Sequence, residues 1–341
     1  MTCAIMHHPT HLRMYRDAAV RMAANELPAA LPDLRSQDPR AREIGGVPYF
    51  LFDHSAPLTP AEIRALSRLT FTYALFDHDG QALTPLGKDP ALYLDESLSG
   101  LLKYTGKTHE LFTRLLLHLA AVQRAAPLRI LDPLAGKGTT LYEALLHGHH
   151  AYGIEADPAY PAEADQYLKK FLTLAHFKHT AHTERISGRA PEGKFTATRY
   201  QTTLAPTKDA MKNDPHHCEI IQGDTRHADY FYKKNTFDAL VADLPYGVQH
   251  GTAQKGKKPQ AAFTRNALGL VQEALPAWRK VLKPDGVLAL SWNTNIIPRG
   301  ELLAVLATQG FCPLAQLAGL DFSHRVDQAI VRDVVVATGL R

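Results

Sequence analysis

The sequence predicts an α/β fold in which a doubly wound, mostly parallel sheet of seven strands is joined to a small N-terminal α+β domain. From about residue 105, short apolar runs alternate with amphipathic helical stretches, a pattern typical of a parallel sheet covered on both faces. Before residue 100, the apolar segments are short and interrupted by Pro, Gly and Asp. The last two apolar runs, 311–320 and 328–338, are joined by Asp321–Asp327, which is too short for a helical crossover. We therefore expect an antiparallel final strand at the sheet edge.

Composition excludes several classes of protein. The chain has 341 residues, 45% hydrophobic and 21% charged, so it is long enough for one large or two modest domains and unlike a disordered chain. Its three cysteines, Cys3, Cys218 and Cys312, are far apart and odd in number, which excludes a disulfide scaffold and favours a reducing compartment. No apolar run approaches the ~18–20 residues of a membrane span, and the first residues lack a secretory signal pattern. We expect a soluble cytoplasmic protein with no membrane contact; its oligomeric state is not predicted.

Residues 1–100 are expected to form the small α+β domain, with a possible role in substrate recognition. Val47–Asp53 and 71–80 have the composition of strands. Thr59, followed by Pro60 and Glu62, predicts a capped helix over 61–69. Segments 27–33, 36–40 and 83–87 contain Pro and polar residues typical of turns.

Residues 101–341 are expected to form the doubly wound domain. Amphipathic spacing predicts helices at 107–125, 139–146, 159–175 and 261–281. Apolar runs predict strands at 128–132, 151–155, 218–222, 237–243, 287–292, 311–320 and 328–338. A polar insertion at 178–216 interrupts this order, and an inserted strand at 194–203 fits its composition.

The first motif is the turn Asp132-Pro-Leu-Ala-Gly-Lys-Gly-Thr-Thr between a strand and a helix. Gly136 and Gly138 allow a tight turn and a close approach of a ligand to the backbone. Glu155 ends the next strand, where a carboxylate suits the two hydroxyls of a ribose. The turn lacks the spacing of a phosphate-binding P-loop, because Lys137 falls between the glycines. A nucleoside-containing ligand is therefore favoured over a simple βα turn.

Two further acids end later strands. Asp224, in Gln222-Gly-Asp-Thr, is placed to accept from an exocyclic amine such as that of adenine. Asp243-Leu-Pro-Tyr-Gly follows an apolar strand and brings a carboxylate, a proline-fixed backbone and an aromatic ring to one point. Asp243 and nearby carbonyls can accept from an –NH2 group, and Tyr246 offers a face for a planar base, a stacking contribution of about 1–3 kcal/mol. Together the motifs predict an enzyme acting on an amine.

These motifs resemble those of the class I S-adenosylmethionine-dependent amino-methyltransferases, which have a Rossmann-like fold. More narrowly, they are similar to the guanine-N2 RNA methyltransferases of the THUMP-associated group; Lys103-Tyr-Thr-Gly-Lys-Thr-His and His324-Arg-Val-Asp add to the resemblance. It covers residues 100–341 apart from the insertion. Leu244 replaces a more usual second proline, a variant found among the guanine-N2 enzymes, and residues 1–100 do not resemble a THUMP domain.

The resemblance implies S-adenosyl-L-methionine as cofactor and a tRNA or rRNA acceptor. It implies that the 132–138 turn holds the methionine part of the cofactor, Glu155 its ribose and Asp224 its adenine amine. Asp243, Pro245 and Tyr246 would act as the catalytic residues that hold and orient the acceptor nitrogen. The expected cofactor-binding residues are Asp132, Pro133, Ala135, Gly136, Gly138, Thr139, Glu155, Asp224, Thr225 and Asp243.

Substrate contacts are expected just after the last motif. Lys255, Lys257 and Lys258 lie in a stretch without acids, where they are placed either to contact phosphates or to form a solvated loop. The full set of expected substrate-binding residues is Leu244, Tyr246, Gly247, Lys255, Lys257 and Lys258. The histidines at 147–150 and 216–217 lack a second ligand pair at zinc-like spacing, so no metal is expected.

Several other functions remain open at this point. A DNA adenine-N6 or cytosine-N4 methyltransferase would use the same Asp-x-Pro-Tyr chemistry, although no separate DNA-recognition domain is evident. A protein-glutamine methyltransferase would also present an amide nitrogen, but Asp rather than Asn at 243 argues against it. An RNA-binding scaffold without activity would be expected to lose the glycine turn or Asp243, and both are intact.

Overall fold

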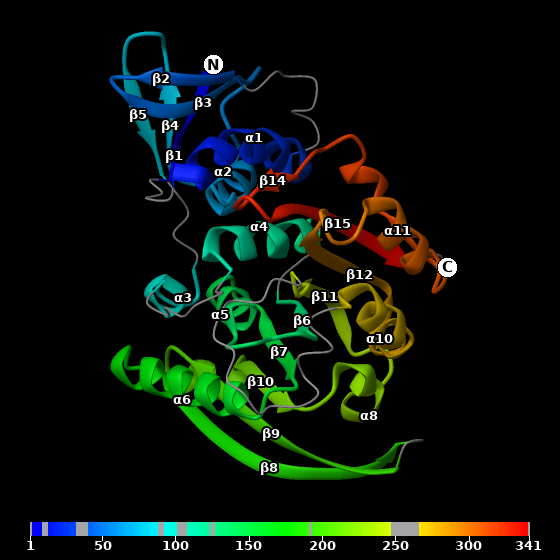
Figure 1. Cartoon of the computed structure of the whole chain (residues 1–341). Coiled ribbons are helices and arrows are strands. Elements are labelled where there is room, and N and C mark those ends of the chain that lie inside the picture. The colour runs from blue at the N-terminus through cyan, green and yellow to red at the C-terminus, as the bar shows by residue number, and fades with distance from the viewer. Residues whose placement is uncertain are drawn as a thin grey trace. The chain divides into compact units, whose positions relative to one another are not determined.

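The structure is a computed structural model that describes residues 2–8, 13–31, 40–87, 92–100, 108–122, 124, 127–190, 193–246 and 266–339. It divides into two compact units (Figure 1). The first combines Met1–Ala91 with Ala315–Asp333, and the second combines Leu92–Leu314 with Val334–Arg341. The division at residues 91 and 92 lies before the expected boundary at 100. The sequence pattern did not predict that residues 315–333 belong to the first unit.

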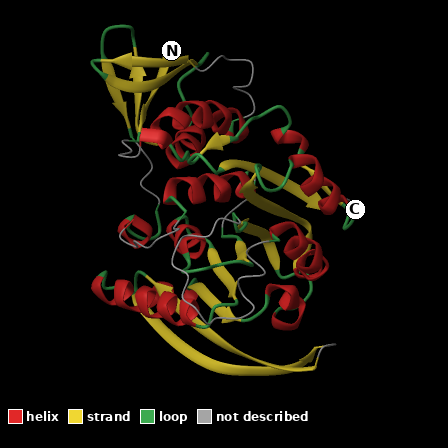
Figure 2. Cartoon of the chain, viewed as in Figure 1, coloured by secondary structure: helices red, strands yellow, loops and turns green. Residues whose placement is uncertain are grey.

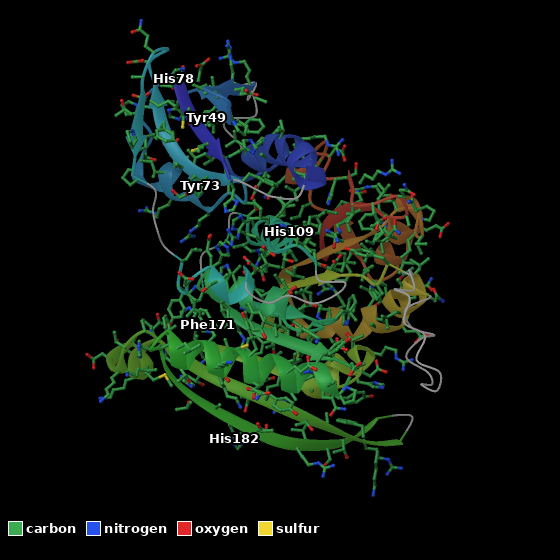
Figure 3. All side chains as sticks on the ribbon, turned by 60° about the vertical axis from the view of Figure 1, so that its left-hand side comes forward. Tyr49, Tyr73, His78, His109, Phe171 and His182 are labelled. Atoms are coloured by element: carbon green, nitrogen blue, oxygen red, sulfur yellow. The ribbon has the colours of Figure 1, made fainter. Side chains whose placement is uncertain are left out.

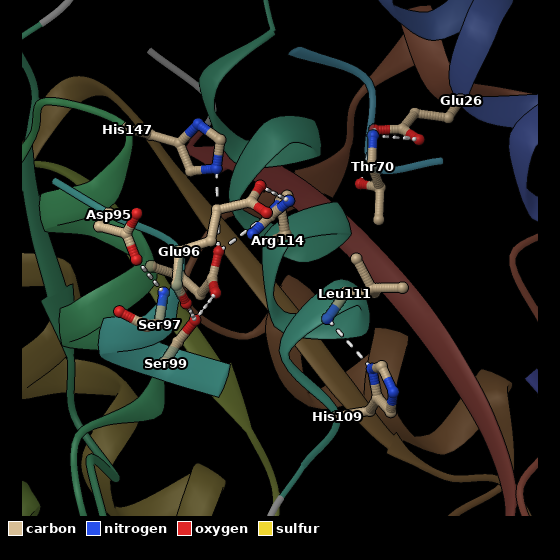
Figure 4. A network of polar contacts seen from close by, with 11 residues as sticks. Glu26, Thr70, Asp95, Glu96, Ser97, Ser99, His109, Leu111, Arg114 and His147 are labelled. Atoms are coloured by element: carbon tan, nitrogen blue, oxygen red, sulfur yellow. Dashed lines mark hydrogen bonds and ion pairs between the residues drawn. The ribbon is translucent and has the colours of Figure 1, made fainter. Parts of the chain in front are cut away.

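The first unit contains an antiparallel sheet of five strands in the order β2-β3-β1-β4-β5. Alternate residues of β1 face opposite sides: Cys3 packs with Leu27 and Leu66 from the helices, whereas Ala4 packs in a second cluster. The Glu26 carboxylate accepts from the backbone N–H (2.9 and 3.0 Å) and hydroxyl (2.8 Å) of Thr70 (Figure 4). The elements are β1(Thr2–His7), α1(Arg13–Ala30), β2(Arg40–Ile44), β3(Val47–Asp53), α2(Pro60–Arg68), β4(Thr72–His78) and β5(Leu83–Leu86).

Sequence patterns predicted this unit only in part. The capping box is confirmed, since Thr59 accepts from the Glu62 N–H while the Glu62 carboxylate accepts from the Thr59 N–H. β1 and α1 were not anticipated, and the expected turn at residue 27 is wrong: Leu27 and Pro28 lie in the last turns of α1. Near a helix end, burial of Leu27 at 2% exposure outweighs the hydrogen bond that Pro28 cannot make. The expected turn at 83 is the strand β5; most of 36–40 lies outside the described residues.

The sheet of the second unit has the strand order β13-β15-β12-β11-β6-β7-β10-β9-β8. The pairs among β6, β7, β10, β11 and β12 are parallel, whereas β8, β9, β13, β14 and β15 pair antiparallel in the registers that the structure defines. The strands are β6(Arg129–Asp132), β7(His150–Glu155), β8(Lys178–Ala190), β9(Gly193–Ala205), β10(His216–Gln222), β11(Phe237–Asp243), β12(Leu282–Asn293), β13(Phe311–Pro313) and β15(Val331–Gly339). The short strand β14(His324–Arg325), which pairs with the first residues of β15, belongs to the segment 315–333 of the first unit.

Helices cover both faces of this sheet, as expected of a doubly wound fold (Figure 2). Tyr152 of β7 belongs to the core cluster that includes Trp278 of α10 and Phe231 of α8. The neighbouring Gly153 faces the opposite side, where Leu141 of α5 would lie 3.1 Å from an added Cβ. The helices are α3(Ser97–Gly100), α4(Glu110–Ala121), α5(Thr139–Leu146), α6(Ala159–Leu174), α7(Lys208–Asn213), α8(Ala228–Phe231), α10(Ala267–Val281) and α11(Arg299–Ala307), with the short 3-10 turn η2(Thr225–His227). A second 3-10 turn, η3(Ala315–Leu317), belongs to the first unit.

Two features of the sheet differ from the expectation. The final strand β15 is antiparallel to β13, but it lies between β12 and β13 rather than at the edge, and β13 ends at Pro313 instead of continuing to 320. The insertion forms a hairpin of two 13-residue strands, β8 and β9, which pairs with β10 and extends the seven-stranded core. The expected strand at 194–203 is confirmed within β9. In the described residues, no helix is long and apolar enough to cross a membrane.

Candidate active site

The carboxyl ends of β6, β7, β10 and β11 bring four acids to one edge of the sheet. Asp132, Glu155 and Asp243 end three of these strands, and Asp224 follows the fourth. The Gly223 N–H donates to the Glu155 carbonyl at 2.8 Å, which fixes the turn after β10 beside the end of β7. Asp243 and Glu155 are both close enough to Asp132 for their charges to raise its pKa. The structure therefore brings the predicted acids together.

The turn after β6 depends on glycine backbone geometry. Gly136 and Gly138 have φ values of 52° and 89°, in the left-handed region that other residues rarely adopt. The Gly138 N–H donates to the Ala135 carbonyl at 2.8 Å, and Gly138 is the N-cap of α5. A Cβ at Gly136 would meet no atom within 4 Å, so the backbone there borders open space. A ligand can approach this backbone closely.

Asp132 lies beneath that turn with 3% of its surface exposed. Its Oδ1 accepts from the Leu134 N–H at 2.9 Å, and Thr140 makes a side-chain hydrogen bond to it. Burial raises the pKa of Asp132 to about 7, and the negative charges of Asp243 and Glu155 act in the same direction. The predicted residues Pro133, Ala135 and Thr139 are also buried at this turn. Asp132 can thus change its charge near neutral pH.

Glu155 connects the glycine turn after β6 to the turn after β7 through hydrogen bonds. Its Oε2 accepts from the Gly136 N–H at 2.8 Å, and its Oε1 accepts from the Asp157 N–H at 2.7 Å. Burial raises the pKa of Glu155, while these two backbone donors oppose that shift. The carboxylate is therefore fixed in position beside the glycine backbone.

Asp224 is held by an arginine that sequence reasoning missed. The Arg226 Nε lies 3.1 and 3.0 Å from the two Asp224 oxygens, and Arg226 Nη2 lies 2.6 Å from Oδ2. Burial acts to raise the pKa of Asp224, but its hydrogen bonds and ion pair with Arg226 hold it below its usual value. The neighbouring Thr225 accepts from Trp278 Nε1 at 2.9 Å and is buried, so its side chain faces the core rather than a ligand.

Three hydroxyl groups surround the Asp243 carboxylate. Tyr246 and Ser291 donate to Oδ1, and Thr108 donates to Oδ2. Ser291 is the register partner of Asp243 on the parallel strand β12. Sequence reasoning identified neither Ser291 nor Thr108 as a partner of this carboxylate. The one signal available for Ser291 was its position near the carboxyl end of the next strand. These contacts fix the rotamer of the central acid.

The residues that follow Asp243 differ in how far they are buried. The Leu244 side chain is 1% exposed and belongs to the main core, so the expectation that it contacts substrate is not supported. Its backbone N–H donates to the Ser291 carbonyl at 2.8 Å. Pro245 and Tyr246 are half-buried. The expected residues Gly247, Lys255, Lys257 and Lys258 lie outside the described residues.

A buried polar network joins the helices α4 and α5 (Figure 4). Arg114 of α4 donates to Glu143 of α5 through Nε at 3.0 Å, and to Glu96 through Nη1 at 3.0 Å. Ser99 also donates to Glu143, whose side chain is fully buried. Because Thr108 directly precedes α4 and the glycine turn precedes α5, this network fixes two segments that carry site residues.

The histidine clusters give no metal centre in the described part of the chain. Within those residues, no group of three or more His, Cys, Asp or Glu side chains is placed to hold one ion. His216 instead stacks on Tyr93 with ring centroids 3.9 Å apart.

Solved structures with a related fold include TrmN from Thermus thermophilus, at 17% identity and a TM-score of 0.43, covering 89% of this chain and 60% of that one. Magnesium protoporphyrin IX methyltransferase (ChlM) from Synechocystis PCC 6803 with bound SAM matches at 12% identity and a TM-score of 0.37, covering 67% and 76%. TYW2 from P. horikoshii in complex with MeSAdo matches at 10% identity and 0.34, covering 88% and 70%. The chain spans 60% of the TrmN length.

No curated protein sequence matches the chain. A family model described as an RMKL-like methyltransferase domain matches residues 103–274, half of the chain and all of the motifs from Asp132 to Asp243. This match confirms the expected methyltransferase domain. The chain belongs to the family of RMKL-like methyltransferase domains.

Proposed function

We propose that this protein transfers a methyl group from S-adenosylmethionine to an exocyclic amine of a nucleic-acid base, with guanine N2 of tRNA or rRNA as the acceptor. The observation that carries the proposal is the Asp243 carboxylate. It ends β11 at the edge where the glycine turn and Glu155 lie, and three hydroxyls hold it in one orientation.

The residues present fit the cofactor. Open space beside Gly136 leaves room for a ligand against the backbone, and Glu155 lies hydrogen-bonded to that glycine. Asp132, beneath the turn, offers a negative charge toward a positively charged methionine moiety. Glu155 would accept from the ribose hydroxyls, and Asp224 from the adenine amine. When bound, S-adenosylmethionine supplies an activated methyl group on a sulfonium.

Asp243 is suited to hold an amine. An ionised carboxylate is purely an acceptor with about four lone-pair positions, which suits it to the N–H bonds of an amine. The lone pair of an aromatic amine is delocalised into its ring, which makes the nitrogen a weak nucleophile. A carboxylate that accepts from the N–H bonds favours a tetrahedral nitrogen, whose localised lone pair can attack the methyl group. Positioning of two reactants in this way is worth about 7–11 kcal/mol in well-oriented reactions. Pro245 fixes the backbone and Tyr246 borders the acceptor.

The choice of RNA rests on the resemblance of Asp243-Leu-Pro-Tyr-Gly to the guanine-N2 enzymes. A paired guanine would have to leave its stack to reach Asp243, at a free-energy cost of about a few kcal/mol. Residues 1–100 are proposed to contribute to substrate selection. A DNA base or a protein glutamine amide would place its nitrogen against the same carboxylate, and these acceptors are the alternatives that the experiment separates.

The test is transfer of label from S-adenosylmethionine to separate pools of tRNA, rRNA, DNA and protein, followed by nucleoside analysis. The proposal predicts label in RNA as N2-methylguanosine. Label confined to protein or DNA contradicts it, and so does labelled RNA in which another atom carries the methyl group.

A further inference from the structure

The inserted hairpin β8–β9 contains more basic than acidic residues. Its segment 178–205 contains five Lys or Arg residues and two Glu residues, whereas the whole chain has 38 Lys and Arg against 34 Asp and Glu. The hairpin therefore has a net positive charge. This element is absent from the pattern that defines the doubly wound core.

The hairpin extends past the edge of the sheet at which the candidate site lies. Gln222, the last residue of β10, is in register with Thr198 of β9, which is in register with Arg185 of β8. Ile186–Ala190 and Gly193–Ala197 therefore continue beyond the carboxyl end of β10. Five residues of extended chain span about 16 Å. Figure 1 shows the hairpin as two long strands that run under the unit.

One face of this extension is packed against the protein. Phe195 lies with its ring centroid 5.6 Å from that of Phe231 in α8, and Ile186 packs against the same core cluster. Gly188 is opposite Phe195, and a Cβ there would lie 2.6 Å from the phenylalanine ring. Arg199 pairs with Glu184 at 2.8 Å and donates to the Phe231 carbonyl at 3.1 Å. The extension is thus held in place by α8.

The other face is exposed and basic. Cross-strand pairs place Arg185 with Thr198, and Arg189 with Lys194, on this side. We call it the basic face; its exposed members are Thr183, Arg185, Ser187, Arg189, Lys194 and Thr196. None of these six is acidic, and its three cations make no ion pair with any residue that the structure describes. Figure 3 shows nitrogen-tipped side chains standing off the hairpin between the labelled His182 and the tip.

We infer that the basic face binds the phosphate backbone of the RNA substrate, an inference that rests on the proposed function. Cations that make no ion pair with a described residue, and that lie next to hydroxyl side chains, match the chemistry of phosphate oxygens. Arg185 lies level with the carboxyl end of β10, and Arg189 and Lys194 lie beyond it, so all three are at the edge of the sheet where Asp224 and Glu155 lie. RNA bound there would therefore lie at the same edge of the sheet as the candidate site. Such contacts add affinity and orientation without reading the base sequence.

The test compares two triple variants with equal loss of charge. The hairpin variant carries Arg185→Gln, Arg189→Gln and Lys194→Gln. The control carries Lys208→Gln, Lys212→Gln and Lys234→Gln, three exposed cations near the opposite, amino ends of the strands. Affinity for the methylated RNA is measured from 0.05 to 0.5 M salt, together with S-adenosylmethionine affinity and thermal unfolding as checks that each variant is folded.

We expect the hairpin variant to lose about 50-fold in RNA affinity near 0.15 M salt, and the slope of log K against log salt to fall by about 2 to 3, the values for three phosphate contacts. The control should lose less than about threefold. Equal affinities for the hairpin variant and the wild type, or equal losses in both variants, overturn the inference while wild-type RNA methylation stands. If the wild type neither binds nor methylates RNA, the proposed function fails and this inference with it.

Discussion

Glu155→Gln is the sharpest single-residue test of the cofactor half of the site. The two carboxylate oxygens each accept one backbone N–H, from Gly136 at 2.8 Å and from Asp157 at 2.7 Å. A glutamine amide has one oxygen and one NH2 group, so in either orientation one of the two backbone donors faces another donor. Hydrogen bonds to a charged group contribute about 1.5–3 kcal/mol each, and the free energy of unfolding should fall by about that amount.

Cofactor affinity should fall by a similar free energy, because the ribose hydroxyls lose a charged acceptor. A loss of 1.5–3 kcal/mol corresponds to an increase of about 10- to 150-fold in the Kd for S-adenosylmethionine. Isothermal titration calorimetry measures this Kd, and urea unfolding of the unliganded protein measures the stability.

The matched control is Glu163→Gln. Glu163 pairs with Lys137 of the same turn at 2.6 Å, but its side chain is 54% exposed, and surface ion pairs contribute only about 0.2–1 kcal/mol. A Glu155→Gln variant that binds the cofactor as tightly as the wild type refutes the assigned role. A loss of the same size in Glu163→Gln would show that charge alone, rather than the two backbone contacts, controls the affinity.

Two further predictions concern Asp132 and the buried network. Since the pKa of Asp132 is raised from 3.8 to about 7 in the folded protein, its ionised form appears only as pH rises through about 7, so calorimetry should show S-adenosylmethionine binding tighten from pH 6 to 8 in the wild type but not in Asp132→Asn. By the same linkage the folded state holds this proton more tightly, so unliganded wild type should lose stability relative to Asp132→Asn between about pH 4 and 7; a constant difference in unfolding free energy would contradict the shift. Glu143→Gln leaves the charge of the buried Arg114 side chain, which is 9% exposed, without its fully buried partner and should lower the free energy of unfolding by about 3–5 kcal/mol. Urea unfolding checks this against Glu96→Gln, whose carboxylate is 48% exposed and should lose less than about 1 kcal/mol; equal losses would show that the network does not depend on burial.

The sequence pattern predicted those site residues that lie at the ends of strands. Asp132, Glu155 and Asp243 each end an apolar run, and the carboxyl ends of parallel strands meet at one edge, so their proximity could be predicted from order alone. The helix over 139–146 and the strand over 237–243 have the predicted bounds. Gly138 precedes the helix, and Asp243 ends the strand.

The missed features depend on pairings between distant segments. Ser291 contacts Asp243 because β12 pairs with β11 in a particular register, which no local pattern specifies. Thr108 reaches the same carboxylate from a segment 135 residues earlier. β15 lies between β12 and β13, although the short connection predicted an antiparallel strand at the sheet edge. Such arrangements are determined by tertiary packing rather than by propensity.

The central claim is that Asp243 holds the acceptor amine, and Asp243→Ala tests it most directly. Single-turnover methyl transfer to the accepted RNA is measured beside the Kd for S-adenosylmethionine. The account predicts that transfer falls by about a thousandfold or more, the scale of lost transition-state hydrogen bonding and positioning, while the Kd stays within about threefold of the wild type. Transfer retained within about tenfold, or a loss of cofactor binding as large as the loss of transfer, would contradict it.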